Sequence, residues 1–143
     1  MGRILAIDYG VKRTGLAVTD PLRIVPGGLS TVPTAQLLTF LSEYIASEKV
    51  DLIVVGYPTQ MNAEESQTTQ KIRPLVTQIE KKFPDIKVVL YDERFTSKLA
   101  QRAILESGMR KMKRRNKALV DEVSAVIILQ SYMDSLEYQQ LNQ

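Results

Sequence analysis

The chain has 143 residues, of which 44% are hydrophobic and 24% charged, and its formal charge is +3. This length fits one domain with one core, and the composition is that of a globular protein. It has no cysteine and no histidine, which excludes disulfides, thiolate or imidazole metal sites and Ser-His or Cys-His catalytic pairs. Aspartate and glutamate remain as acid–base groups or ligands, and a metal held by them would be a hard ion such as Mg²⁺ or Mn²⁺.

The N-terminal third predicts three antiparallel strands. Residues 3–9 and 14–19 form short apolar strands, and residues 10–13 have the chemistry of a hairpin turn. The next segment, RIVPGGLSTV, is interrupted by a Pro-Gly-Gly sequence at residues 26–28, which is typical of an irregular or edge strand.

The N-terminus does not have the pattern of a targeting signal. The segment MGRILAIDYG turns polar at Asp8, before an apolar signal region could form. The longest apolar segments are far shorter than a membrane span. We therefore expect a cytoplasmic protein with no membrane partner.

After the third strand, helical patterns alternate with buried strands. Residues 35–48 have the spacing of an amphipathic helix, and residues 51–56 form an apolar, β-branched strand. A polar loop leads into a second helical pattern that ends near Phe83. Pro74 lies inside this pattern, so the helix either kinks there or starts later than its periodicity suggests. Residues 86–91 predict another buried strand.

The C-terminal third predicts two helices separated by a basic loop. Thr96 is a plausible N-cap for a helix over residues 97–107, and Gly108 marks its end. The final segment, ALVDEVSAVIILQSYM, is apolar on nearly all sides and predicts a mostly buried helix. Together the elements predict a single α/β domain over residues 1–143. Its sheet would be mixed and five-stranded, with three antiparallel N-terminal strands followed by parallel strands and flanking helices.

Three acidic positions lie where such a sheet binds ligands. Asp8 ends the first strand, and Asp92 and Glu93 end the last one, where the carboxyl ends of parallel strands form a ligand-binding rim. Asp121 lies near the start of the final helix among apolar neighbours that direct it toward the sheet, where an unpaired carboxylate is costly. If Asp8, Glu93 and Asp121 converge, two divalent cations about 4 Å apart would relieve their repulsion and could activate water against a phosphodiester.

Each of these carboxylates also has an ordinary structural interpretation. Asp8 could be a turn residue at the hairpin. Glu93 could simply pair with Arg94 or Lys98. Asp121 could be an acid favoured by the dipole at the start of a helix. Only the joint pattern favours a metal site.

Positive charge is concentrated beside the proposed site. The basic loop MRKMKRRNK precedes the final helix and a Lys-Arg pair follows the first strand, and a phosphate backbone is the natural partner of such charges. A solvated surface loop is the alternative interpretation. Tyr9, Tyr57 and Phe95 are the candidate stacking faces for bases. The candidate nucleic-acid contacts are Lys12, Arg13, Arg94, Arg110, Lys111, Lys113, Arg114, Arg115 and Lys117.

A nucleotide-binding site is the competing interpretation of the segment DYGVKRTG. This segment is similar to the first phosphate loop of sugar kinases, actin and Hsp70-type ATPases, in which an Asp-X-Gly turn opens a hairpin. Those proteins close two domains around the nucleotide, whereas this chain has room for one. It also lacks a Walker A motif and a glycine-rich adenosine-binding segment. The sequence therefore disfavours an ATPase or kinase.

Four segments occur in the order and spacing of a known family: AIDYGVKRTGLAVTD, IVVGYPTQMN, YDERFTS and ALVDEVSAVIILQSYM. The chain resembles the YqgF family of RNase H-fold nucleases, which are described as pre-16S rRNA nucleases and Holliday junction resolvases. The resemblance implies an RNase H-like fold with Asp8, Glu93 and Asp121 as the metal-binding triad, and the choice of Glu93 over Asp92 depends on it. Lys12 and Arg13 match the family's Lys-Arg pair.

The chain departs from the family pattern at two places. The loop after Gly56 reads Tyr57-Pro58 where the family usually has Leu-Pro, and it lacks the glycine that usually follows. Ser124-Ala125 stands where the family usually has Ala-Ala, a change that a helix accommodates easily.

The resemblance implies a cytoplasmic, Mg²⁺- or Mn²⁺-dependent hydrolase that trims the 5′ end of precursor 16S rRNA by two-metal in-line attack. Its partners would be precursor rRNA and ribosomal subunit precursors, and the chain would be a monomer or a weak homodimer. A Holliday junction endonuclease would use the same site on branched DNA, as a dimer that makes paired cuts. A third hypothesis is a non-catalytic ribosome-assembly factor with a structural triad. The RNA and DNA hypotheses share every residue named here.

Overall fold

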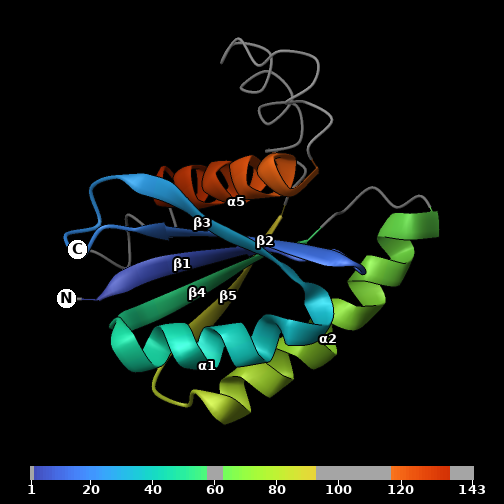
Figure 1. Ribbon diagram of the computed structural model, residues 1–143, viewed down its shortest axis with the longest axis horizontal. Coiled ribbons are helices and arrows are strands. Elements are labelled where there is room, and N and C mark those ends of the chain that lie inside the picture. The colour runs from blue at the N-terminus through green and yellow to red at the C-terminus, as the bar shows by residue number, and fades with distance from the viewer. Residues whose placement is uncertain (1, 58–62, 93–116, 136–143) are drawn as a thin grey trace, which may run out of the picture.

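A five-stranded mixed sheet forms the centre of the computed structural model, which describes residues 2–57, 63–92 and 117–135 (Figure 1). The strand order is β3-β2-β1-β4-β5. β1–β2 and β2–β3 are antiparallel, whereas β1–β4 and β4–β5 are parallel. This arrangement confirms the predicted sheet. The strands are β1 (Arg3–Asp8), β2 (Arg13–Thr19), β3 (Pro26–Pro33), β4 (Val50–Tyr57) and β5 (Lys87–Asp92).

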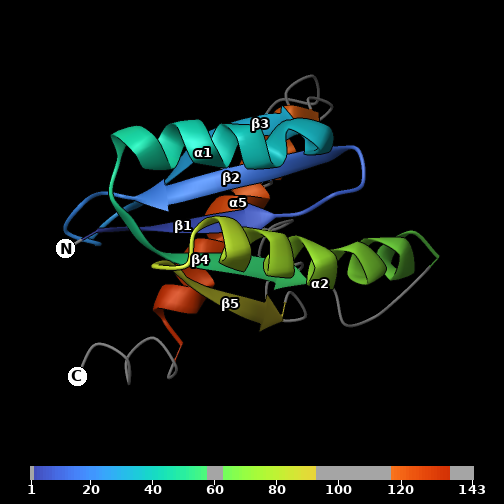
Figure 2. The same cartoon turned by 90° about the horizontal axis from the view of Figure 1, so that it is seen from below.

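Helices cover both faces of the sheet (Figures 1 and 2). A 3-10 turn (Thr34–Gln36) leads into α1 (Leu37–Ser47), and α2 spans Ala63–Lys82. Both lie on one face, with α1 beside β3 and α2 beside β4 and β5. The helix α5 (Lys117–Met133) crosses the opposite face. In the part of the chain that is described, no helix combines the length and apolarity needed to cross a membrane.

Side-chain alternation along the strands divides the core into two layers. Leu5 and Ile7 of β1 face α1 and α2, whereas Ile4 and Ala6 face α5. Both faces are therefore buried, which explains the continuous apolar runs in the sequence. The α1–α2 layer contains Leu5, Ile7, Leu16, Leu37, Leu41, Val50, Ile53, Val55, Ile72, Leu75, Ile79 and Ile86. The α5 layer contains Ile4, Ala6, Ala17, Leu52, Val54, Val89, Ala125, Ile128, Leu129 and Tyr132.

Pro74 lies in the interior of α2, which is helical from residue 63 to residue 82. The helix therefore does not start after the proline, and that predicted possibility is wrong. Ile72, Leu75 and Ile79 are buried against the sheet on both sides of Pro74. Their packing offsets the roughly 3 kcal/mol that proline costs in a helix interior.

β5 is less buried than predicted, whereas the described part of α5 is mostly buried or half-buried, as expected. β5 is an edge strand, so Val89 is buried whereas its neighbour Leu90 is 41% exposed. α5 packs on the sheet with one face: Ala125 and Leu129 are buried, and Gln130 is exposed. Burial at a sheet edge depends on which elements lie alongside, and this information is absent from the local hydrophobicity.

β3 is the other edge strand and is irregular, as predicted. A register shift occurs between Leu16 and Ala17 of β2, and Gly28 of β3 pairs with Ala17. A Cβ added at Gly28 would lie 3.1 Å from Oε1 of Glu122, whereas a Cβ at Gly27 would have nothing within 4 Å. Gly28 thus allows the close approach of α5 to the edge of the sheet.

The loop between β2 and β3 is ordered by its own polar groups. The carboxylate of Asp20 accepts hydrogen bonds from three backbone amides. The donors are those of Ile24 (2.7 Å), Val25 (2.8 Å) and Leu22 (3.3 Å). These bonds, that of Val25 above all, hold the pKa of Asp20 below its ordinary value. The apolar side chains of the three donor residues remain exposed.

Candidate active site

Asp8 is the last residue of β1 and lies where the parallel strands end. It pairs with Gly15 of β2 on one side and with Gly56 of β4 on the other. By alternation it shares the α5 face with Ile4 and Ala6. Its carboxylate is half-buried. Both neighbouring strands carry glycine at this level, so neither places a Cβ directly beside Asp8.

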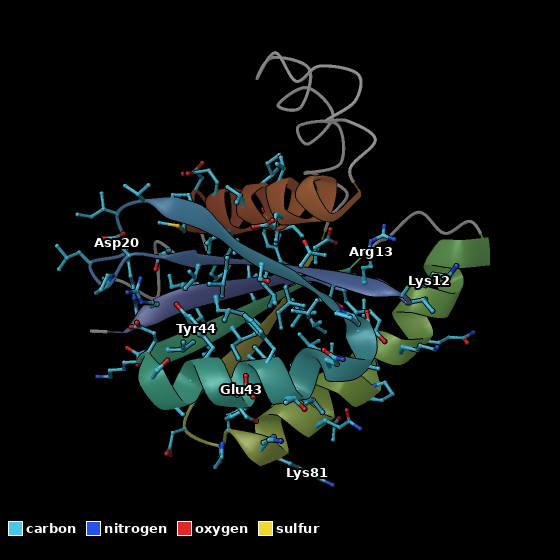
Figure 3. The ribbon with its side chains drawn as sticks, viewed as in Figure 1. Lys12, Arg13, Asp20, Glu43, Tyr44 and Lys81 are labelled. Carbon is cyan, nitrogen blue, oxygen red and sulfur yellow. The ribbon has the colours of Figure 1, made fainter. Side chains whose placement is uncertain are left out.

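Arg13 lies on the same face of the sheet as Asp8. It opens β2 two residues before Gly15, which places it diagonally across from Asp8, within reach of a long side chain. Figure 3 shows Arg13 at this end of the sheet, on the side that α5 covers, with Lys12 beside it in the hairpin loop. Arg13 is half-buried and Lys12 is exposed. The structure thus brings Arg13 to the Asp8 face and leaves Lys12 at the rim.

Thr34 anchors the hairpin loop to the start of α1. Its hydroxyl donates to the carbonyl of Gly10 (2.6 Å) and lies 2.9 Å from the hydroxyl of Thr14. Because a hydroxyl has one proton, Thr14 is the donor in the second contact. The amide of Thr34 donates to the carbonyl of Lys12 (3.0 Å). A Cβ at Gly10 would overlap the carbonyl oxygen of Arg13, so this tight loop requires glycine.

The other two predicted ligands are only partly described. The backbone of residue 121 lies in α5, one turn before the buried Ala125 and on the same helix face. Its neighbour Glu122 approaches β3 at Gly28. Figure 1 places the first turns of α5 at the end of the molecule where β1 ends. The structure describes neither Glu93 nor the side chain of Asp121.

Among the side chains that the structure describes, in residues 2–57, 70–91 and 122–135, no group of three or more acidic ones is arranged to hold a metal ion. A metal centre at Asp8 would therefore need Glu93 and Asp121, the predicted ligands whose side chains the structure does not describe. The backbone of Lys117 begins α5. The helix predicted over residues 97–107, its Thr96 cap and most of the basic loop lie outside the described residues. So do Arg94, Arg110, Lys111, Lys113, Arg114 and Arg115.

Sequence analysis missed the glycines on either side of Asp8 and the anchoring role of Thr34. Gly15 and Gly56 are far apart in the sequence, and only the strand register brings both beside Asp8. Thr34 precedes a helical pattern, where a threonine is usually a cap. Here its hydroxyl bonds the hairpin loop instead.

Comparison with known proteins gives close matches over nearly the whole chain. A family model described as "RuvX: Holliday junction resolvase" matches residues 2–135. A Porphyromonas gingivalis protein named "Putative pre-16S rRNA nuclease" is 64% identical over 135 residues, which cover 94% of this chain and 98% of that protein. Proteins of the same name are 59% identical in Phocaeicola vulgatus and 50% identical in Flavobacterium johnsoniae. Each match covers 96% of this chain, and 99% and 100% of the respective relative.

One similar solved structure is that of "T. thermophilus RuvC in complex with Holliday junction substrate". The TM-score is 0.61, and the match covers 94% of this chain and 98% of that chain. The sequence identity is 14%, so this likeness concerns the fold.

Proposed function

We propose that this chain, which belongs to the RuvX family, is a divalent-metal-dependent nuclease that cuts structured nucleic acid at the Asp8 end of its sheet. The sequence motifs indicated the same family under the name YqgF. The likeness to RuvC confirms the predicted RNase H-like fold. The activity itself is argued from the site.

The surroundings of Asp8 carry the proposal. Asp8 is a half-buried acidic residue at the end of a central strand, and both neighbouring strands have glycine beside it, so neither strand places a side chain there. Arg13 lies on the same face and supplies a cation with several donors for a phosphate oxygen. A negatively charged ligand group close to a carboxylate also calls for further positive charge, which bound metal ions would provide.

Mg²⁺ or Mn²⁺ fits the donors that this chain offers. The chain has no histidine and no cysteine, so carboxylates are its anionic ligands. We assign this role to Asp8, Glu93 and Asp121. Val89 and Tyr91 of β5, the strand that precedes Glu93 in the sequence, contribute to the α5 layer. When bound, two such ions supply activation of the attacking water and stabilisation of the leaving oxygen.

The residues around the triad would bind and orient the substrate. Thr34 and Gly10 hold the hairpin loop in place, so that Lys12 and Arg13 present their charges at a fixed position beside Asp8. The phosphate backbone would lie along these cations. It would be contacted further by Arg94, Arg110, Lys111, Lys113, Arg114, Arg115 and Lys117.

Precursor 16S rRNA, cut at its 5′ end, is the substrate that we favour. The relatives named for this substrate are 50–64% identical and match almost their entire length. The partners would be precursor rRNA within ribosomal subunit precursors, and the compartment the cytoplasm. A monomer suffices for a single cut.

A Holliday junction endonuclease is the second candidate, favoured by the description of the family model. It would use the same residues on branched DNA. Two symmetric cuts would require a dimer, so this candidate predicts self-association on the junction.

The test is a cleavage assay in Mg²⁺ or Mn²⁺ with a precursor 16S rRNA 5′ fragment and a four-way DNA junction. Asp8→Asn should lower cleavage more than about 100-fold, because removal of even an outer partner of a metal ligand typically costs 10–100-fold. Asp85→Asn is the matched control: it makes the same change on an exposed residue of the α2–β5 loop.

Preference for the RNA fragment would support rRNA processing, and paired cuts in the junction would support the second candidate. Equal cleavage by wild type and Asp8→Asn would overturn the nuclease proposal. Normal rRNA processing in cells that carry only Asp8→Asn would instead favour a non-catalytic assembly factor.

A further inference from the structure

We propose that the pocket between the hairpin loop, α1 and α2 binds an unpaired base of the nucleic-acid substrate. This subsite rests on the nuclease function proposed above. It lies on the opposite face of the sheet from Asp8. Its volume is about 490 Å³, within the range of roughly 300–1,000 Å³ that is common for small-ligand sites.

The hairpin loop connects this pocket to the Asp8 site. Tyr9 follows Asp8 directly, and alternation sends its side chain to the α1–α2 face, where it lines the pocket. Val11 and Thr34 also line it. The exposed Lys12 lies in the same loop. A substrate strand bound near Asp8 would reach the pocket by continuing around this loop, where Lys12 would contact its phosphates.

The pocket lining has the chemistry that base recognition uses. Tyr9 supplies an aromatic ring for stacking, and Leu38 and Pro74 supply apolar surface. Gln70 and Gln78 carry amides that both donate and accept hydrogen bonds, as the edge of a base requires. The phenol of Tyr9 can donate a hydrogen bond as well.

The charge at the pocket suits the phosphates of a nucleotide and disfavours a cationic ligand. Of the lining residues in the described part of the chain, Lys71 is the charged one, and none is a carboxylate. Together with Lys12 it would place positive charge on both sides of a bound base, where the adjoining phosphates would lie. An unpaired base of the substrate strand satisfies the aromatic, amide and cationic groups at once.

The binding test uses two hairpin RNAs with 5′ tails of equal length and charge, one with normal nucleotides and one with abasic nucleotides. Binding is measured without divalent ions, so that no cleavage occurs. The full chain should bind the normal tail about 5- to 150-fold more tightly than the abasic tail, the effect expected for roughly 1–3 kcal/mol per stacked base. Equal affinities would overturn the proposal.

Variants on the surface of α2 test whether the preference for the normal tail arises at the pocket. Lys71→Ala and Gln78→Ala should reduce the preference for the normal tail, and both residues are exposed, so the fold should tolerate the changes. Lys81→Ala removes the same charge near the far end of α2 and is the matched control. Lys81→Ala should weaken the binding of both RNAs equally and keep the preference for the normal tail. Identical behaviour of Lys71→Ala, Gln78→Ala and Lys81→Ala would exclude the pocket as the base site.

Fluorescence gives a direct readout, because the chain contains no tryptophan. Tyr9→Trp introduces a single indole, whose emission should change on addition of the normal tail and not of the abasic tail. An equal response to both tails would contradict base binding at this position.

The two proposals fail in different ways. Metal-dependent cleavage without any preference for the normal tail would refute the base pocket and leave the nuclease intact. No cleavage by the wild type, with a pocket-dependent preference for the normal tail, would refute the nuclease and leave the binding site.

Discussion

Replacing Gly10 with alanine should impair both stability and nuclease activity. The added Cβ would lie less than 3.0 Å from the carbonyl oxygen of Arg13, whereas ordinary contacts begin at 3.4 Å. The obstacle is backbone, so relief requires the hairpin loop to move by at least about 0.4 Å, the difference between these two distances. This movement would disturb the 2.6 Å hydrogen bond from Thr34 to the carbonyl of Gly10.

The expected loss of stability has two parts. Overpacking of a tight site costs about 1–3 kcal/mol, and a lost hydrogen bond costs about 1 kcal/mol, which gives roughly 2–4 kcal/mol for Gly10→Ala. For activity, Gly10 lies between Asp8 and Arg13, so loop movement displaces groups on which the proposed site depends. Since a displacement of about 1 Å can lower a rate about 100-fold, we expect kcat/KM to fall by up to about that factor.

Urea unfolding and the Mg²⁺ cleavage assay test this prediction together. Gly27→Ala is the control, because its Cβ would enter open space, and its stability should remain within about 0.5 kcal/mol of the wild type. If Gly10→Ala matched Gly27→Ala in both the urea midpoint and the cleavage rate, the argument from close approach would be refuted.

Three further predictions concern the fold. Thr34→Val should lower the free energy of unfolding by about 1–3 kcal/mol and slow cleavage, because it removes the hydroxyl that anchors the loop, whereas Thr34→Ser should keep both near wild type in the same assays. The carboxylate of Asp20 has a lowered pKa, chiefly through the amide of Val25, so its contribution to stability is present above pH about 4 and lost as the pH falls through the folded-state pKa. Asp20→Ala should therefore destabilise the fold less below pH 4 than above it, as measured by urea unfolding at each pH. A larger destabilisation at the lower pH would contradict this prediction. Leu41→Ala, at a fully buried position, should cost about 2–5 kcal/mol, whereas Leu22→Ala, at a position 68% exposed, should change the urea midpoint little.

The number of strands and their antiparallel or parallel type could be predicted from the local pattern and the position of the helices between them. The apolar runs of β1 and β4 reflect burial on both faces, and the Pro-Gly-Gly segment of β3 reflects its edge position. The exposure of Leu90 could not be predicted, and the sequence left open whether the helix continues through Pro74 or starts after it. Both depend on neighbours that are distant in the sequence: the first on the absence of a further described strand beside β5, the second on the packing of α2 against the sheet.

The candidate site was likewise predictable only in part. Asp8 could be located from its place at the end of an apolar strand, whereas the choice of Glu93 over Asp92 depended on family resemblance. The glycines beside Asp8 could not be predicted, because the register of β1 with β2 and β4 decides which residues are level with it. The split of the Lys12-Arg13 pair between the rim and the Asp8 face likewise follows from where β2 begins.

The central position of β1 has a consequence for how the protein folds. Its pairing with β2 closes a loop of a few residues, whereas its parallel pairing with β4 must wait for the whole of β3 and α1 to be made. Short loop closures are the fast and entropically cheap ones. During synthesis the β1–β2–β3 meander can therefore form first, with Asp8 and the hairpin loop already in register. The arrival of β4 then brings Gly56 level with Asp8, and β5 and α5 follow, so that the surroundings of Asp8 form in the order in which the chain is translated.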